Sequence, residues 1–245
     1  MTIPKIIHQI WLQGYDNIPS VLVQYNKECH RINDDFEHVF WDEAKITTFL
    51  GSHYDQSHVD LFNYFVIPAQ KADFARYAIL YHYGGIYLDM DMKCKKNLCS
   101  LLHHELFFTA DPFPDFFGKY LIGIIGAHPY HPVFSYAITK IFERKHLSDD
   151  VLKSTGTSLF YDSVQDFTRH NPNHNIGLID RKYLDPCGIL SDDDCKDTCD
   201  ECFVVHTNNA SWSVKNRILK TLYRRRILII IIIVIIILLI IYYKS

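Results

Sequence analysis

Two aspartates, Asp89 and Asp91, directly follow the apolar residues 86–88 and are separated by a single methionine. Side chains two apart on a strand project to the same face, so both carboxylates enter one cleft if the strand continues to its end. Mg²⁺ and Mn²⁺ prefer carboxylate and phosphate oxygens. A lone Asp-x-Asp is weak evidence, but two like charges placed after an apolar strand are costly to bury without a cation. The pattern therefore predicts a divalent metal that holds a phosphate-bearing substrate.

The segment before these aspartates predicts the elements that position them. Pro68 suits the first turn of a helix, where its missing N–H costs nothing. Gly84 and Gly85 supply the unhindered backbone that a chain needs to leave a helix. We therefore expect a helix over residues 68–83, a forced stop, and a strand over residues 85–88 that ends at the two carboxylates.

Asp73 and Arg76 lie three residues apart on the expected helix and so share a face. One interpretation is a local ion pair, worth a few tenths of a kcal/mol, roughly, at an exposed site. The other is that both side chains contact a bound sugar. The spacing alone leaves both open.

Three blocks carry a resemblance to a known family: residues 3–11 (IPKIIHQIW), residues 69–91, and residues 206–212 (HTNNASW). In this order they resemble the DXD-containing sugar transferases of glycosyltransferase family 32, which include yeast-type initiating mannosyltransferases and are related to the clostridial glucosylating toxins. The resemblance implies an α/β fold of the GT-A (Rossmann-like) type. It also implies a nucleoside-diphosphate sugar as donor, a Mn²⁺ or Mg²⁺ ion, and transfer with retention of configuration.

The same resemblance implies roles for five residues. Asp73 and Arg76 match positions that contact the donor sugar, and Asp89 matches an acid near the ribose, the sugar and the ion. Asp91 matches the direct metal ligand, and His206 a late histidine that completes the metal site. A lone histidine among the 14 of this chain would otherwise be a surface or core residue, so His206 depends on the His-x-x-x-x-Ser-Trp pattern.

Further residues match the donor and acceptor sides of the family site. Trp11 matches a ring that stacks on the donor base, although a tryptophan after an apolar run is more often a core residue. Ser211 and Trp212 match groups near the diphosphate. Gly156 falls where the family often has a Thr-Gly-Pro loop on the acceptor side, and Thr157 stands in place of the proline.

The chemistry expected of such a site is electrostatic. A metal held by Asp91 would neutralise the charge that develops on the leaving diphosphate, and Asp73 or Asp89 would stabilise the positive charge on the sugar. The motifs contain no evident covalent nucleophile of the two-carboxylate glycosidase type. The pattern therefore favours displacement on the same face, assisted by the leaving group.

Length and composition fit one α/β domain followed by a short tail. The chain has 245 residues, 48% of them hydrophobic, and a formal net charge of −3, which excludes a basic nucleic-acid surface. Apolar runs alternate with helix-like stretches. Expected strands cover residues 5–12, 37–41, 85–88, 105–109 and 120–125, and expected helices cover residues 18–28, 42–50, 68–83, 131–144 and 158–169.

The C-terminal region predicts a membrane anchor. Residues 227–241 are an unbroken run of Ile, Leu and Val, extended by two tyrosines and preceded by three arginines at 224–226. At ~1.5 Å per residue the stretch reaches about 25 Å as a helix, within the range for a membrane span. We expect a sugar-transferase domain over 1–215, a basic linker over 216–226 and a transmembrane helix over 227–243. The arginines, and an N-terminus without signal-peptide features, favour a single-pass membrane protein whose catalytic domain is cytosolic.

Seven cysteines leave the compartment open. Cys187, Cys195, Cys199 and Cys202 surround one acidic segment and are compatible with zinc, with disulfides or with free thiols. Disulfides would argue against the cytosolic placement.

Two alternatives to a sugar transferase remain at this level. A haloacid-dehalogenase-type phosphatase also has Asp-x-Asp after an apolar strand, but Lys93 and the long preceding segment disagree with that pattern. A membrane-tethered module that binds sugar nucleotides without turnover is the non-enzyme alternative. The acceptor, whether glycan, lipid or protein, is not specified by any motif.

Overall fold

The computed structural model describes residues 2–110, 120–187 and 199–207. Its centre is a mixed six-stranded sheet of order β2-β1-β3-β6-β5-β7, in which β1 pairs parallel to β2 and β3, β6 pairs antiparallel to β3 and β5, and β5 pairs parallel to β7. The strands are β1 (Ile6–Ile10), β2 (Glu37–Trp41), β3 (Gly85–Leu88), β5 (Leu106–Ala110), β6 (Tyr120–Ala127) and β7 (Ile176–Ile179).

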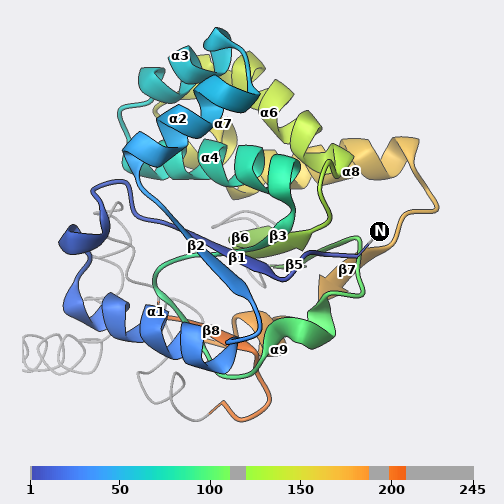
Figure 1. Ribbon diagram of the computed structural model, residues 1–245. Coiled ribbons are helices and arrows are strands. Elements are labelled where there is room, and N and C mark those ends of the chain that lie inside the picture. The colour runs from blue at the N-terminus through green and yellow to red at the C-terminus, as the bar shows by residue number, and fades with distance from the viewer. Residues whose placement is uncertain (1, 111–119, 188–198, 208–245) are drawn as a thin grey trace, which may run out of the picture.

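Two layers cover the sheet (Figure 1). The helices on one face are α2 (Glu43–His53), α3 (Gln56–Tyr64), α4 (Pro68–Tyr83), α6 (Pro132–Arg144), α7 (Val151–Ser154) and α8 (Thr157–His170). The opposite face holds α1 (Ser20–Ile32), α9 (Arg181–Leu184) and an antiparallel ribbon of β4 (Met92–Cys94) and β8 (Val204–His206). Each layer packs its own buried apolar cluster against the sheet, so the sheet is buried on both sides.

The turn from α4 into β3 has the form that the sequence predicted. Pro68 begins α4, and Gly84 and Gly85 leave it with φ values of 64° and 88°. A Cβ atom on Gly84 would lie 2.6 Å from the backbone nitrogen of Pro129, and one on Gly85 would lie 2.7 Å from the carbonyl oxygen of Ile6. Both glycines are therefore required for conformation and for space.

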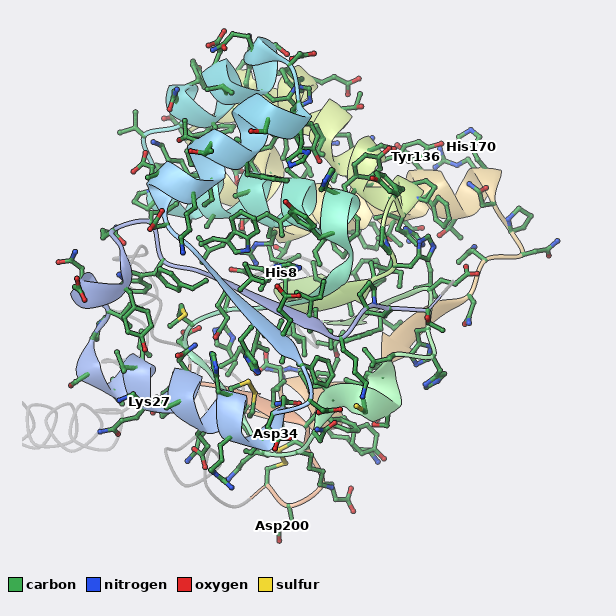
Figure 2. All side chains as sticks on the ribbon, in the orientation of Figure 1. His8, Lys27, Asp34, Tyr136, His170 and Asp200 are labelled. Atoms are coloured by element: carbon green, nitrogen blue, oxygen red, sulfur yellow. A yellow bond between two sulfur atoms is a disulfide. The ribbon has the colours of Figure 1, made fainter. Side chains whose placement is uncertain are left out.

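A buried histidine ties this turn to β1. His8, labelled in Figure 2, accepts a hydrogen bond at Nδ1 from Trp41 Nε1 (3.2 Å), so its Nε2 carries the hydrogen and donates to the Gly84 carbonyl (3.0 Å). Burial lowers the pKa of His8 to about 4, against the effect of the Gly84 carbonyl. The imidazole is therefore neutral at physiological pH and has a structural role.

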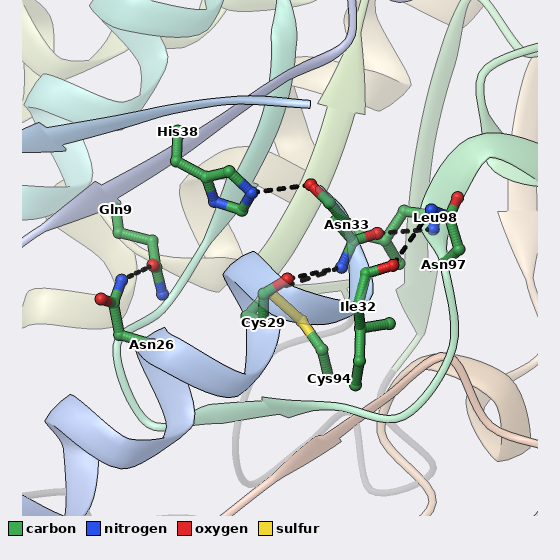
Figure 3. Close-up of a disulfide and its surroundings, with 9 residues drawn as sticks. All are labelled: Gln9, Asn26, Cys29, Ile32, Asn33, His38, Cys94, Asn97 and Leu98. Atoms are coloured by element: carbon green, nitrogen blue, oxygen red, sulfur yellow. Dashed lines mark hydrogen bonds between the residues drawn. A yellow bond between two sulfur atoms is a disulfide. The ribbon is translucent and has the colours of Figure 1, made fainter. Parts of the chain in front are cut away.

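A disulfide fixes the ribbon to the helix beneath the sheet. Cys29 of α1 is bonded to Cys94 of β4, across 65 residues of sequence, and both are fully buried (Figure 3). In the acidic segment, Cys199 is bonded to Cys202, and Cys187 is disulfide-bonded as well. For these residues the structure supports the disulfide interpretation over zinc or free thiols, and Cys195 lies outside the described residues.

The expected α/β architecture is confirmed, with differences at the short elements. Strands β2 and β3 and helix α4 have the predicted bounds, whereas α3, α7, α9 and strands β4, β7 and β8 were not predicted. No helix in the described part of the chain is long and apolar enough to cross a membrane. The expected linker 216–226 and span 227–243 lie outside the described residues.

Candidate functional site

The two aspartates are brought together by a tight turn. Strand β3 ends at Leu88, as predicted, and the Met92 N–H donates to the Asp89 carbonyl (3.0 Å), so the extended geometry that would place both carboxylates on one face does not continue through Asp91. The Asp89 N–H is held by the Gly123 carbonyl of β6 at 2.8 Å. The prediction of convergence is correct, but its geometric reason was wrong: the chain reverses within the motif and folds the second carboxylate back toward the first.

The β4–β8 ribbon carries the third candidate ligand to this turn. Met92 pairs with His206 across the ribbon, and His206 Nε2 lies 3.1 Å from Asp91 Oδ1. Both the N–H and the hydroxyl of Thr207 donate to the Asp91 carbonyl, at 2.9 and 2.8 Å. The end of the ribbon thereby fixes the backbone of Asp91 as well as its carboxylate.

Asp89, Asp91 and His206 fit a divalent metal. One ligand atom from each lies within 4.8 Å of those of the other two, and within the described residues this is the one group of three or more such side chains that does so. Burial lowers the pKa of His206, but Asp91 outweighs it and raises the pKa to about 10. A bound cation would take the place of that proton, because a histidine coordinates a metal as the neutral imidazole.

Arg76 connects the candidate metal ligands to Asp73. Its guanidinium lies 3.0 Å from Asp73 Oδ1 and 3.4 Å from Asp89 Oδ1, donates to the Ile122 carbonyl at 2.6 Å, and stacks 4.3 Å from the centre of the Tyr87 ring. The side chains of Arg76 and Asp73 are each 6% exposed. The pair is therefore part of the buried site and does not act as an exposed brace on the helix.

The electrostatics of this group follow from burial and mutual contact. Burial raises the pKa of Asp73 to about 6, against the lowering effects of Arg76 and of a hydrogen bond from Thr155. Burial also raises the pKa of Asp89, and Asp91 adds to this while Arg76 opposes it. Burial alone would lower the pKa of Arg76, but the surrounding groups raise it, so Arg76 remains charged.

Trp11 lies beside the turn that carries Asp89 and Asp91. Its half-buried ring packs in a small cluster with Ile18, Leu22 and Met90, the residue between the two aspartates. The indole Nε1 is buried and has no hydrogen-bond partner among the described residues. A packed ring at the edge of the site is compatible with both interpretations of Trp11.

The remaining predicted positions divide between the described and undescribed parts of the chain. Gly156 caps α8 and lies next to Asp73, since a Cβ atom on it would be 3.5 Å from Asp73 Oδ2. Thr157 is the first residue of α8, the position at which a helix also accepts proline. Ser211 and Trp212 lie outside the described residues.

Sequence reasoning missed several residues that hold the site together. Tyr87 donates from its hydroxyl to Asp89 Oδ1 (2.6 Å), and strand alternation two residues before Asp89 was a usable indication. Gly123 leaves room for the same carboxylate, because a Cβ atom there would lie 3.0 Å from Asp89 Oδ2. Thr155 and Thr207 lie in segments that the resemblance matched, but their bonds to Asp73 and Asp91 arise from tertiary packing, which the local pattern does not indicate.

Comparison with known proteins identifies the type of site. Residues 19–108 match the family model described as a glycosyltransferase sugar-binding region containing a DXD motif. The chain is 47% identical over 221 residues to an uncharacterized glycosyltransferase of Acanthamoeba polyphaga mimivirus, covering 90% of this chain and 88% of that protein. It is 33% identical over 147 residues to inositol phosphoceramide mannosyltransferase 1 of Schizosaccharomyces pombe, covering 59% of this chain and 44% of the yeast protein.

The fold is shared with a glycosyltransferase of known structure. The PaToxG glycosyltransferase superimposes with a TM-score of 0.52 at 19% identity, covering 70% of each chain. At this identity the similarity establishes the GT-A-like fold, and the contacts described above remain those of this chain alone.

The metal group gives the first prediction. Titration with Mn²⁺ should raise the melting temperature of the wild-type protein, since a ligand at 100 times its Kd stabilises by about 2.7 kcal/mol. Asp91→Asn and His206→Ala should lose most of that shift, measured by differential scanning fluorimetry. Asp162→Asn, which removes an aspartate paired with Arg144 at 2.7 Å elsewhere on the surface, is the matched control and should keep it. Equal shifts in all four proteins would show that these residues do not bind the ion.

Proposed function

The chain belongs to glycosyltransferase family 32, the sugar transferases with a DXD motif, and from this premise we propose that it transfers a sugar from a nucleoside-diphosphate donor in a metal-dependent reaction that retains configuration. The observation that carries the proposal is the continuous group formed by Asp91, His206, Asp89, Arg76 and Asp73. It combines candidate metal ligands with buried charges suited to a sugar.

The donor is proposed to lie across the carboxyl ends of β1 and β3. Asp91, Asp89 and His206 would hold Mn²⁺ or Mg²⁺, which supplies a Lewis acid for the leaving diphosphate. Trp11, packed against Met90, would stack on the base, and Ser211 and Trp212 would approach the diphosphate.

Asp73 and Arg76 are proposed to bind the sugar. Asp73 binds Arg76 through Oδ1 and the Thr155 hydroxyl through Oδ2, so both of its oxygens already have protein partners. A carboxylate fixed in this way is well placed to accept a hydrogen bond from a sugar hydroxyl and to balance positive charge on the sugar. It is less suited to forming a covalent bond. This supports displacement on the same face in preference to a glycosyl-enzyme intermediate.

Neither the phosphatase nor the non-catalytic binding module is favoured over a sugar transferase. The matched family is a glycosyltransferase family, which does not support the phosphatase alternative. The motif positions within the described residues are occupied by groups that can perform the reaction, which is evidence against a silent binding module.

We further propose a membrane-linked acceptor. The chain spans less than half of the yeast relative, whose name specifies an inositol phosphoceramide, so a lipid acceptor is a proposal here and not a transfer of identity. The apolar run 227–241 supports it, because tethering raises the local concentration of enzyme around any acceptor in the same bilayer.

Turnover tests the function directly. The full chain, purified in detergent, should hydrolyse at least one member of a panel of nucleoside-diphosphate hexoses when Mn²⁺ is present. Asp91→Asn should lower that rate by two orders of magnitude or more, as expected when several kcal/mol of charge stabilisation are removed. The release of nucleoside diphosphate is the measurement. Undiminished hydrolysis in Asp91→Asn or in excess chelator would contradict the metal-dependent proposal.

The raised pKa of Asp73 predicts the acid side of the pH–rate profile. Only the ionised carboxylate balances positive charge on the sugar, so at saturating metal the rate should fall about tenfold per pH unit below pH ~6. Asp73→Asn should be slow at every pH and should lose this limb. An isosteric change is needed. Both substitutions remove the charge that faces Arg76, but alanine would also remove the oxygen that accepts from Arg76 and leave a cavity, which lowers stability further. If the fall in rate below pH ~6 persists unchanged in Asp73→Asn, a group other than Asp73 causes it.

Membrane placement gives a further prediction, in which two features oppose each other. The arginines at 224–226 favour a cytosolic catalytic domain, whereas the Cys29–Cys94 disulfide favours an oxidising compartment. If the arginines decide, protease added to sealed vesicles should digest the domain and leave a short protected tail. Protection of the whole domain, together with resistance of Cys29 and Cys94 to alkylation before reduction, would reverse the orientation.

A further inference from the structure

A buried segment between α7 and α8, residues 154–156, is fastened along one face of α4. Gln70 donates to the Ser154 hydroxyl at 2.7 Å, and Tyr77 donates to the Thr155 carbonyl at 3.0 Å. Both Ser154 and Thr155 are fully buried. Bonds at two levels of α4 therefore fix the backbone of this segment relative to the helix, independently of Asp73.

Asp73 lies between these two levels and receives the one side chain of the segment directed at the site. The Thr155 hydroxyl lies 2.9 Å from Asp73 Oδ2, and the Val151 carbonyl lies at 3.3 Å from the same hydroxyl. A hydroxyl donates one hydrogen, and the shorter bond to a charged acceptor is the stronger of the two. The Thr155 hydroxyl therefore donates to Asp73 and not to the Val151 carbonyl of the preceding turn.

The two bonds to Asp73 constrain it in different ways. Arg76 holds Oδ1 from the same helix, three residues away, and moves with it. The hydroxyl of Thr155 holds Oδ2 from a separate segment, 82 residues along the chain, and so fixes the rotation of the carboxylate relative to the rest of the site. Without it, one oxygen of a buried carboxylate would lose its partner, and the group could turn toward other donors.

We propose that Thr155 is a positioning residue that holds Asp73 in the orientation required to face the donor sugar. The inference rests on the proposed sugar transfer. Thr155 is the threonine of the segment that matches the family's Thr-Gly-Pro loop, and that match assigns no role to its hydroxyl, which here bonds to Asp73. Thr155 would not touch the substrate. Its contribution to the rate would pass entirely through the carboxylate of Asp73.

A double-mutant cycle tests this dependence. Thr155→Val keeps the shape of the side chain and removes the hydroxyl, and Thr155→Ser restores it. Thr155→Val should lower kcat for donor hydrolysis about ten- to hundredfold, the effect of one hydrogen bond to a charged group, and Thr155→Ser should recover most of the rate. In an Asp73→Asn background, Thr155→Val should change the rate by less than about threefold, because the orientation it controls no longer matters. If Asp73→Asn has no measurable rate, the same cycle is measured by calorimetry, from the Kd values of the four proteins for the intact sugar nucleotide that the wild type hydrolyses.

Thr109→Val separates positioning from packing. Thr109 is also fully buried, and its hydroxyl donates to a backbone carbonyl, that of Ile179, at 2.8 Å. The Thr109→Val variant should lower the melting temperature about as much as Thr155→Val does, while retaining the wild-type kcat. An unaffected Thr155→Val, or an equal loss in both backgrounds, would overturn this inference alone. A wild-type protein that hydrolyses no donor would overturn the proposed function and this inference with it.

Discussion

The sharing of one buried guanidinium between two carboxylates is the interaction on which the site depends. Asp73, Asp89 and Asp91 gather at one end of the sheet, and Arg76 lies between the first two at 3.0 and 3.4 Å. Burying such charges is costly unless each is paired. With His206 protonated, two positive charges face three negative ones, and exchange of that proton for a divalent cation makes the group neutral. The charge balance thus favours a bound metal without reference to any relative.

Arg76 also connects the layers of the fold. It starts on α4, lies over the Tyr87 ring of β3 and donates to the Ile122 carbonyl of β6. The next residue, Gly123, holds the Asp89 N–H and leaves space for its carboxylate. A helix, a strand and its neighbour therefore meet at one cation, so an error in the turn at Gly84 and Gly85 would displace the whole group.

The local half of the site was predictable from sequence, and the long-range half was not. Helix α4, the glycine turn and β3 follow from proline, glycine and apolar patterning within a single stretch, and they deliver Asp73, Arg76 and Asp89. The end of β3 at Leu88 was predicted, but the turn over residues 89–92 was not, because period-two alternation describes only residues that stay extended. Thr155 and Thr207 were missed for a different reason. Thr155 contacts Asp73 across 82 residues of chain, and Thr207 contacts Asp91 across 116. Such contacts depend on tertiary packing.

His206 shows how a family pattern and physical support complement each other. Its motif indicated a ligand, but β8 is three residues long and a two-stranded ribbon is marginal by itself. The ribbon is held because β4 continues directly from Asp91 and is bonded to α1 through Cys94 and Cys29. Closing a loop of 65 residues removes roughly 4 kcal/mol of chain entropy from the unfolded state in the standard account. The disulfide is thus three residues from Asp91, one candidate metal ligand, and supports the ribbon that carries His206, another, so the redox state of the compartment and the integrity of the candidate metal site are physically linked.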